Sequence, residues 1–143
     1  MKLRALVVDD SRVMRSMVMQ QLRRSTQAEF EFTEAEDGVD ALKKFHPSKI
    51  DIAFVDWNMP NMSGIEFVRR VRSMGKTEHV PIVMVTSEKT VGKLEEALDD
   101  AGANAFISKP FTNEILDRKL APLIKDMEER ASSRGGFFSK LMK

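Results

Sequence analysis

Short apolar segments alternate with amphipathic segments along most of the 143 residues. Between the apolar segments, hydrophobic residues recur at helical spacing. Five apolar segments are rich in β-branched and aromatic residues, as strands are; they are Leu3 to Val8, Glu29 to Ala35, Ile50 to Val55, Ile82 to Thr86 and Ala105 to Ser108. This alternation is typical of a parallel sheet covered on both faces by helices. The pattern therefore predicts an α/β fold.

Three of the expected helices begin after residues that cap helix N-termini, namely Ser11, Ser63 and Thr112. Their side-chain oxygens can accept hydrogen bonds from the first unpaired backbone N–H groups of a helix. A further helix is expected near Thr90 to Ala101, because its apolar residues recur at i, i+3, i+4 and i+7. Each helix would then present one apolar face to the sheet.

The C-terminal part of the chain departs from this regular pattern. Pro122 interrupts the last helix, so we expect a kink near residues 118–122 or a break into two shorter helices. Residues 130–143 are predicted to form a flexible tail that is both basic and apolar. Its Phe137 and Phe138 follow two glycines. The tail would fold back, stay disordered, or dock on a partner or a membrane surface.

Composition narrows the class of protein. The chain has no cysteine, which excludes disulfides and thiolate metal sites. Two acids interrupt the N-terminus before a signal-peptide core could form, and no apolar run is long enough to span a bilayer, so we expect a cytoplasmic protein. Residues 1–129 carry 19 basic against 22 acidic side chains. A mildly acidic body argues against nucleic-acid binding.

Polar side chains stand where four of the five strands end. Asp9 and Asp10 follow the first strand, Asp56 follows the third, Thr86 ends the fourth and Lys109 follows the fifth. Taken alone, Asp56 could begin a turn, Thr86 could cap a strand and Lys109 could be a solvated surface residue. Right-handed crossovers gather the carboxyl ends of parallel strands at one edge of the sheet, where ligands bind. Together these residues therefore predict a site.

Three neighbouring carboxylates need compensation, because two of them about 4 Å apart repel by about 4 kcal/mol at an effective dielectric near 20. Either some protons stay bound or a cation enters. Oxygen ligands without histidine or cysteine favour Mg²⁺. Mg²⁺, an ammonium and a hydroxyl together form a site for a phosphoryl group. Asp56 would be the nucleophile, and neither His46 nor His79 lies near a strand end, so the phosphoryl donor is expected to be another molecule.

Four motifs in this chain resemble the receiver domain of two-component response regulators. They are Val7-Val8-Asp9-Asp10-Ser11, Asp56-Trp57-Asn58-Met59-Pro60-Asn61-Met62-Ser63-Gly64, Val85-Thr86-Ser87 and Phe106-Ile107-Ser108-Lys109-Pro110-Phe111. The resemblance covers about residues 1–127 and is strongest to stand-alone, CheY-like chemotaxis regulators. It implies a flavodoxin-like fold with a five-stranded parallel sheet in the order 2-1-3-4-5, and a receiver domain over residues 1–129.

The resemblance also implies roles for single residues. Asp56 is similar to the aspartate that takes a phosphoryl group from a histidine kinase. Asp10, Asp56 and the backbone carbonyl of Asn58 resemble the direct Mg²⁺ ligands of the family, and Asp9 resembles the residue that acts through water. The peptide bond between Lys109 and the next residue corresponds to the family's cis peptide.

Other positions correspond to the family's switch and its timing. Thr86 and Lys109 resemble the partners of the phosphoryl oxygens, and Phe106 occupies the position of the switch aromatic. That position is often Tyr in chemotaxis members, so a hydroxyl is missing here. Asn58 and Glu88 stand where the family tunes hydrolysis of the phosphoaspartate.

The expected function is that of a phosphoacceptor switch. Its phosphorylation would require a histidine kinase as donor and Mg²⁺ as cofactor. It would catalyse only its own phosphorylation and dephosphorylation, act as a monomer, and signal to a target protein through its fourth helix, fifth strand and fifth helix, in chemotaxis or motility. A phosphorelay intermediate or phosphate sink is an alternative. A Mg²⁺-dependent phosphatase with an aspartyl-phosphate intermediate is another, although such enzymes usually carry an acid at the position of Asn58. A flavin-binding protein is disfavoured, because Asp9 and Asp10 would repel a phosphate.

Overall fold

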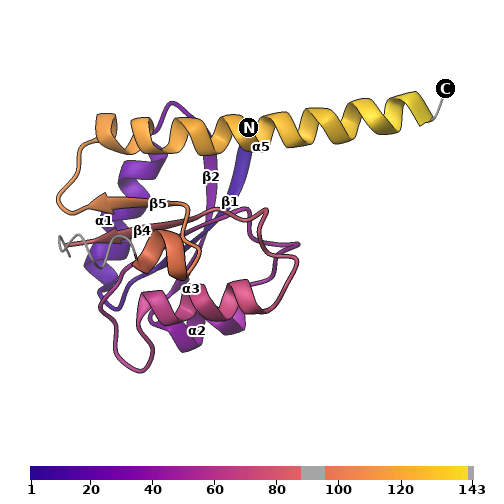
Figure 1. Cartoon of the computed structure of the whole chain (residues 1–143). Helices are drawn as coiled ribbons and strands as arrows, with labels where there is room; N and C mark the ends of the chain where they lie inside the picture. The colour runs from indigo at the N-terminus through magenta and orange to yellow at the C-terminus, as the bar shows by residue number, and fades with distance from the viewer. Residues whose placement is uncertain (88–95, 142–143) are drawn as a thin grey trace.

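Five parallel strands form one sheet in the computed structural model, which describes residues 1–87 and 96–141 (Figure 1). The strands are β1 (Lys2–Val8), β2 (Glu29–Ala35), β3 (Ile52–Val55), β4 (Ile82–Thr86) and β5 (Ala105–Ser108). Their order in the sheet is β2-β1-β3-β4-β5, and every neighbouring pair is parallel. The predicted α/β fold and strand order are confirmed.

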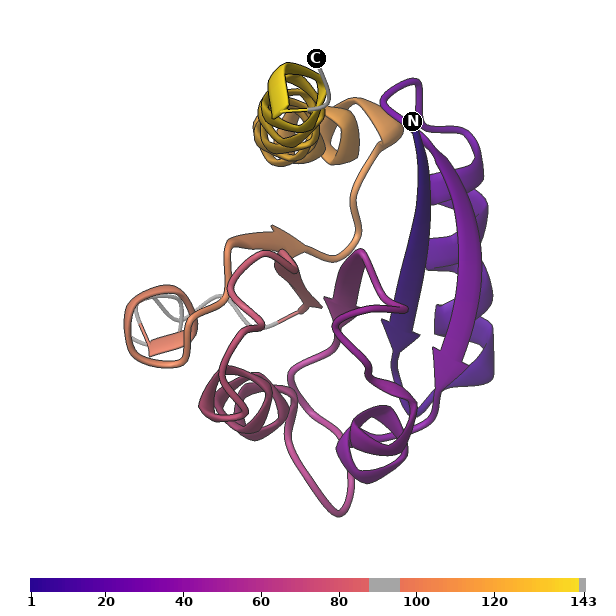
Figure 2. The ribbon, with the colours of Figure 1, turned by 90° about the vertical axis from the view of Figure 1, so that its right-hand side faces the viewer.

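Helices lie on both faces of the sheet (Figures 1 and 2). They are α1 (Arg12–Arg23), α2 (Gly38–Lys44), α3 (Gly64–Ser73) and α5 (Asn113–Leu141), with a π-helical turn at Glu96–Asp100. Side chains of α1 and α5 are buried against one face, and side chains of α2 and α3 against the other. The first half of the helix expected at 90–101, residues 90–95, lies outside the described residues.

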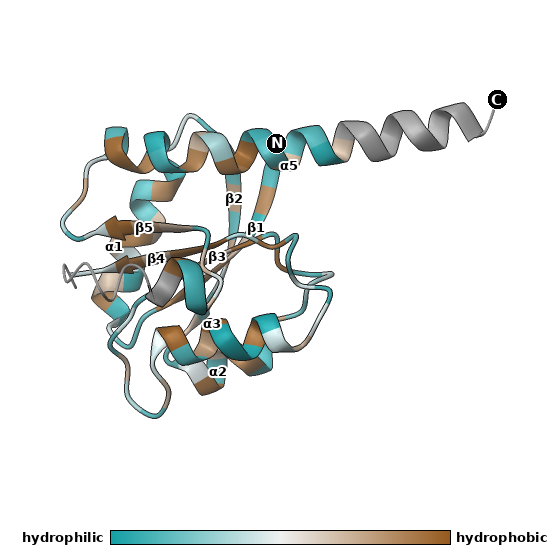
Figure 3. Ribbon diagram, in the orientation of Figure 1, coloured by the Kyte–Doolittle hydropathy of each residue, from teal (hydrophilic) through white to brown (hydrophobic). Residues whose placement is uncertain are grey.

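The pleat of the strands divides the core in two. Leu6, Val8 and Val55 point to the α2 and α3 side, whereas Val7 and Phe54 point to the α1 and α5 side. All five are nearly inaccessible to solvent, as expected for central parallel strands covered on both faces. The hydropathy colouring shows hydrophobic central strands, whereas hydrophobic and hydrophilic residues are mixed along the helices (Figure 3).

The predicted helix caps Ser11, Ser63 and Thr112 are confirmed. Each side-chain oxygen accepts a hydrogen bond of 3.2 Å from the backbone N–H three residues further along the chain. A lost cap of this kind typically costs about 1 kcal/mol. The cap of α1 also fixes the short connection from β1, which carries Asp9 and Asp10. The cap of α3 fixes the end of the loop that begins at Asp56.

The predicted break into two shorter helices at Pro122 is wrong, because α5 is a single helix with this proline inside it. The alternative of a kink stays a prediction. An interior proline costs about 3 kcal/mol. Leu120 and Ile124, on either side of it, are buried against the sheet, and burying two such side chains contributes about 3 to 6 kcal/mol. Packing therefore outweighs the local preference, and α5 continues to Leu141. The domain boundary at residues 129–130 stays a prediction.

None of the helices that the structure describes combines the length and the apolar composition that a bilayer crossing requires.

Candidate functional site

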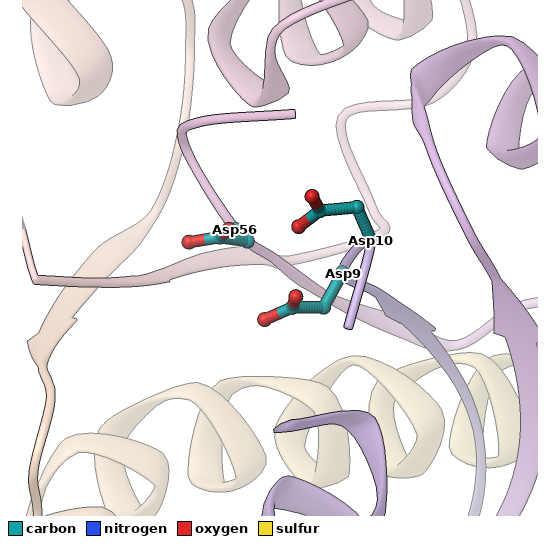
Figure 4. A group of neighbouring side chains, drawn as sticks. All are labelled: Asp9, Asp10 and Asp56. Carbon is teal, nitrogen blue, oxygen red and sulfur yellow. The ribbon is translucent and has the colours of Figure 1, made fainter. Parts of the chain in front are cut away.

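The side chains predicted to form a site lie at the carboxyl edge of the sheet. Asp9 and Asp10 directly follow β1, and Asp56 directly follows β3. These strands are neighbours, with Val8 paired to Val55, and the Asp56 N–H donates to the carbonyl of Val8 at 2.9 Å. This register places the two acid segments next to each other (Figure 4).

The three carboxyl groups form a compact cluster, with one oxygen from each of Asp9, Asp10 and Asp56 lying within 4.8 Å of the others. Asp9 is buried, Asp56 is partly buried and Asp10 is exposed. Within residues 1–87 and 96–141 this is the only group of three such side chains close enough to share an ion. An all-oxygen set that is open to water on one side fits Mg²⁺, which keeps several of its waters.

Lys109 reaches the same cluster from the end of β5. Its ammonium Nζ lies 2.9 Å from Oδ2 of Asp9 and 3.4 Å from Oδ1 of Asp56. One ammonium offsets one of three carboxylate charges, so two negative charges remain when all three acids are ionised. A divalent cation would neutralise that remainder. The peptide bond between Lys109 and Pro110 is cis, as the resemblance implied.

Burial raises the pKa of the Asp56 carboxyl above its ordinary value. The charge of Lys109 opposes this shift and that of Asp9 adds to it, while hydrogen bonds from Lys109 and the backbone of Trp57 lower the pKa. The ionised form of Asp56 is therefore disfavoured in the free protein. A bound cation would relieve this cost, because an opposite charge nearby favours the ionised carboxylate.

Asp9 is held by hydrogen bonds at its backbone and its side chain. Its N–H donates to Ala35 at 3.2 Å, and its carbonyl accepts from Nη1 of Arg15 at 2.7 Å. Its Oδ1 accepts from the N–H of Ser11 at 2.9 Å, and its Oδ2 accepts from Lys109. Sequence reasoning missed Arg15. The available signal is a basic residue one turn into the helix that follows the acid pair.

The loop after Asp56 makes a close backbone turn that sequence reasoning also left without a role. The N–H of Gly64 donates to the carbonyl of Trp57 at 2.8 Å. A Cβ on Gly64 would lie 1.9 Å from the backbone oxygen of Asp56, so a larger residue cannot fit without moving the loop. Asn61 adopts a left-handed backbone with φ of 70° and donates from Nδ2 to Oδ2 of Asp37 at 3.0 Å.

The remaining predicted residues take different positions. Thr86 is fully buried at the end of β4, and its carbonyl accepts from the N–H of Lys109 at 3.0 Å. Phe106 is half-buried in β5 and packs against the core on the α2 and α3 side. Asn58 is exposed, two residues beyond the phosphoacceptor candidate. Glu88 lies outside the described residues.

Comparison with known proteins agrees with this geometry. The response regulator receiver domain model matches residues 5–121. The chain is 36% identical over 126 residues to chemotaxis protein CheY of Pseudomonas aeruginosa, covering 86% of this chain and 97% of that protein. It is 39% identical over 123 residues to a CheY homolog of Campylobacter jejuni, covering 85% and 92%. The solved structure of CheY4 of Vibrio cholerae superposes with a TM-score of 0.74 at 34% identity, covering 86% and 99%.

Proposed function

The chain belongs to the response regulator receiver domain family, and we propose that it is a phosphoacceptor switch with Asp56 as the acceptor. The phosphoryl group comes from a phosphohistidine of a kinase. Its N–P bond breaks while an O–P bond forms to a carboxylate oxygen of Asp56. The observation that carries the proposal is the position of Lys109, whose ammonium lies within 3.4 Å of both Asp9 and Asp56 at the open edge of the sheet.

Mg²⁺ is the proposed cofactor, held by Asp10, Asp56 and the backbone carbonyl of Asn58, with Asp9 acting through water. The ion would neutralise charge on the phosphoryl oxygens. The chain's own contribution is position. Asp9 is fixed by its hydrogen bonds, and the turn at Gly64 fixes the backbone of Asp56. Both acids are therefore in place before any ligand binds.

Thr86 and Lys109 are proposed to bind the transferred phosphoryl oxygens and so to drive the switch. Reversing a two-state population from 1:99 to 99:1 requires about 5.5 kcal/mol. Hydrogen bonds to charged groups contribute about 1.5 to 3 kcal/mol each, so new bonds from Thr86 and Lys109 could supply most of this free energy. Phe106, next to this pair on β5, is proposed to change its packing in response, and Asn58 and Glu88 to set the lifetime of the phosphoaspartate.

The proposed target surface includes β5 and α5. A groove of about 380 Å³ lies there, lined in part by Leu98, Phe106, Lys119 and Pro122. The first half of the expected fourth helix, residues 90–95, lies outside the described residues. Because the relatives are chemotaxis proteins, we propose a cytoplasmic, monomeric regulator in chemotaxis or motility. A phosphorelay intermediate or phosphate sink would use the same acceptor site.

Intact-mass measurement after incubation with acetyl phosphate and Mg²⁺ tests the proposal. The wild type should gain one phosphoryl group, and Asp56→Asn or added EDTA should abolish the gain. Asp51→Asn, an acid at the opposite end of β3, is the matched control and should still be phosphorylated. An equal adduct on Asp56→Asn would contradict the proposal. Repeated turnover of a generic phosphate ester would favour the phosphatase alternative.

A further inference from the structure

We propose that Arg15 is a positioning residue that fixes the β1–α1 loop in the geometry that Asp9 and Asp10 need for cation binding. The part concerning the cation rests on the proposed function. Arg15 lies on α1 and does not belong to the acid cluster itself. It acts on the cluster through the backbone that carries it.

The guanidinium of Arg15 joins three segments of the chain. Nη1 donates to the carbonyl of Asp9 at 2.7 Å, where β1 ends. Nε donates to Oε1 of Glu34 on β2 at 3.0 Å. The backbone N–H of Arg15 donates to the carbonyl of Ser11, which caps the same helix. One side chain therefore ties the start of α1 to the end of β1 and to the edge strand.

The contact with Asp9 is sheltered from solvent. The side chain of Arg15 is 13% exposed, whereas that of its second partner, Glu34, is 45% exposed. The sheltered hydrogen bond runs from a charged donor to a carbonyl, and such bonds are stronger than those between neutral groups. The ion pair to Glu34 is half open to water and contributes less. Loop position therefore depends mainly on the bond to Asp9.

Arginine suits this position because its planar fork has several donors in a fixed arrangement. Two acceptors, the carbonyl of Asp9 and the carboxylate of Glu34, are contacted by different nitrogens of one guanidinium. A lysine ammonium at the end of a flexible chain is a single point donor. Arg15→Lys keeps the positive charge but cannot reproduce the rigid bridge between two acceptors. This variant therefore separates the effect of charge from the effect of geometry.

Positioning and charge predict opposite effects on cation affinity. A positive side chain near three carboxylates repels a divalent cation, so removing its charge alone would tighten binding. If Arg15 instead holds the loop in place, its removal should weaken binding although the local charge becomes more negative. The sign of the change therefore decides between the two roles.

Mg²⁺ titrations followed by Trp57 fluorescence measure this sign, since Trp57 adjoins Asp56. Arg15→Met should weaken Mg²⁺ binding about tenfold, which corresponds to about 1.4 kcal/mol. Arg12→Met is the matched control, because Arg12 is an exposed arginine in the first turn of the same helix. It loses the same charge and should bind Mg²⁺ as tightly as wild type or slightly tighter. Arg15→Lys should resemble Arg15→Met, and Glu34→Gln should show a smaller loss.

Amide hydrogen exchange of the ion-free protein provides a readout that does not need the cation. The N–H of Ser11, which donates to Oδ1 of Asp9, should exchange about tenfold faster in Arg15→Met than in Arg12→Met. Unchanged exchange there, or Mg²⁺ binding as tight as in the control, overturns the inference. If Arg15→Met fails to fold, Arg15→Lys and Glu34→Gln decide by the same two measurements. Absence of Mg²⁺ binding in wild type would contradict the proposed function, while the exchange data would still judge Arg15.

Discussion

The ammonium of Lys109 lies 2.9 Å from Oδ2 of Asp9, although the two residues are 100 positions apart in the chain. Its distance to Asp56 is longer, 3.4 Å. In the free protein the ammonium is therefore bound more closely to Asp9 than to the proposed acceptor. A phosphoryl group on Asp56 would present new anionic oxygens to the same ammonium. These oxygens would compete with Asp9 for Lys109, and movement of Lys109 toward them would begin the conformational change.

Substituting Lys109 should separate cation binding from switching. In Lys109→Met the acid cluster loses its ammonium, so Mg²⁺ should bind about three- to tenfold more tightly, because repulsion between the two cations disappears. The same variant should show no conformational response to beryllofluoride, a phosphoryl mimic. Fluorescence titration measures the Mg²⁺ affinity, and NMR spectra of the backbone amides measure the response to beryllofluoride. Weaker Mg²⁺ binding in Lys109→Met would contradict this account of the charges.

Neutralising Asp56 should stabilise the fold in the absence of Mg²⁺. Its ionised form is disfavoured by burial and by the charge of Asp9, and Asn removes that charge at nearly the same volume. We expect Asp56→Asn to raise Tm at pH 7 by about 2–5 °C, as a gain near 1 kcal/mol would. Asp10→Asn, at the exposed acid, should raise it less. Thermal unfolding in EDTA compares the variants, and a lower Tm for Asp56→Asn would contradict the prediction.

Gly64 should tolerate no side chain. Its Cβ would collide with the backbone oxygen of Asp56 at 1.9 Å, and a backbone atom cannot move aside as a side chain can. Gly64→Ala should lower the free energy of unfolding by about 3 kcal/mol, at the upper end of overpacking costs. Gly75 is the control, because its φ of 75° is left-handed but its Cβ would meet nothing within 4 Å. Gly75→Ala should cost only about 1 kcal/mol; equal costs in urea unfolding would refute the steric argument.

Asp51 should contribute to the acid sensitivity of the fold. Its carboxylate accepts hydrogen bonds from Nε and Nη2 of Arg4 at 3.0 and 2.9 Å, and the side-chain bond from Arg4 is the main cause that lowers the pKa of Asp51 below 3.8. The unfolded state then binds more protons than the folded state as pH falls, so stability present above pH 3.8 is lost as pH drops through the folded pKa.

The variant Asp51→Asn measures that contribution. Because the pair with Arg4 is partly exposed, the loss at pH 7 should be about 1 kcal/mol. The difference from wild type should shrink as the pH falls below 3.8. Urea unfolding at several pH values provides the comparison. A difference that stays constant into acid would mean that the charge of Asp51 does not contribute.

The sequence was sufficient to predict the sheet, the helix caps and the place of the acid cluster. Strand periodicity and caps are local signals, and a parallel sheet gathers its strand ends at one edge. Asp9, Asp56 and Lys109 could therefore be brought together without coordinates. Pro122 shows the limit of local reasoning, because burial of Leu120 and Ile124 overrides its helix-breaking tendency.

Contacts through the backbone could not be predicted. The bond from Arg15 to the carbonyl of Asp9 and the close approach of Gly64 to Asp56 depend on how separate segments pass one another in space. Neither leaves a periodic signal in the sequence. Both contacts nevertheless hold the loops that carry the acids. The residues that support the site could therefore be identified only from the structure.

Chemical mapping of the phosphoryl group tests the central claim most directly. Borohydride reduces an aspartyl phosphate to homoserine, which peptide mass spectrometry can locate after treatment of the protein with acetyl phosphate and Mg²⁺. The account predicts homoserine at position 56, dependent on both reagents, and none at positions 9 and 10. Homoserine at position 9 or 10, or none at any position in folded wild-type protein, would contradict it.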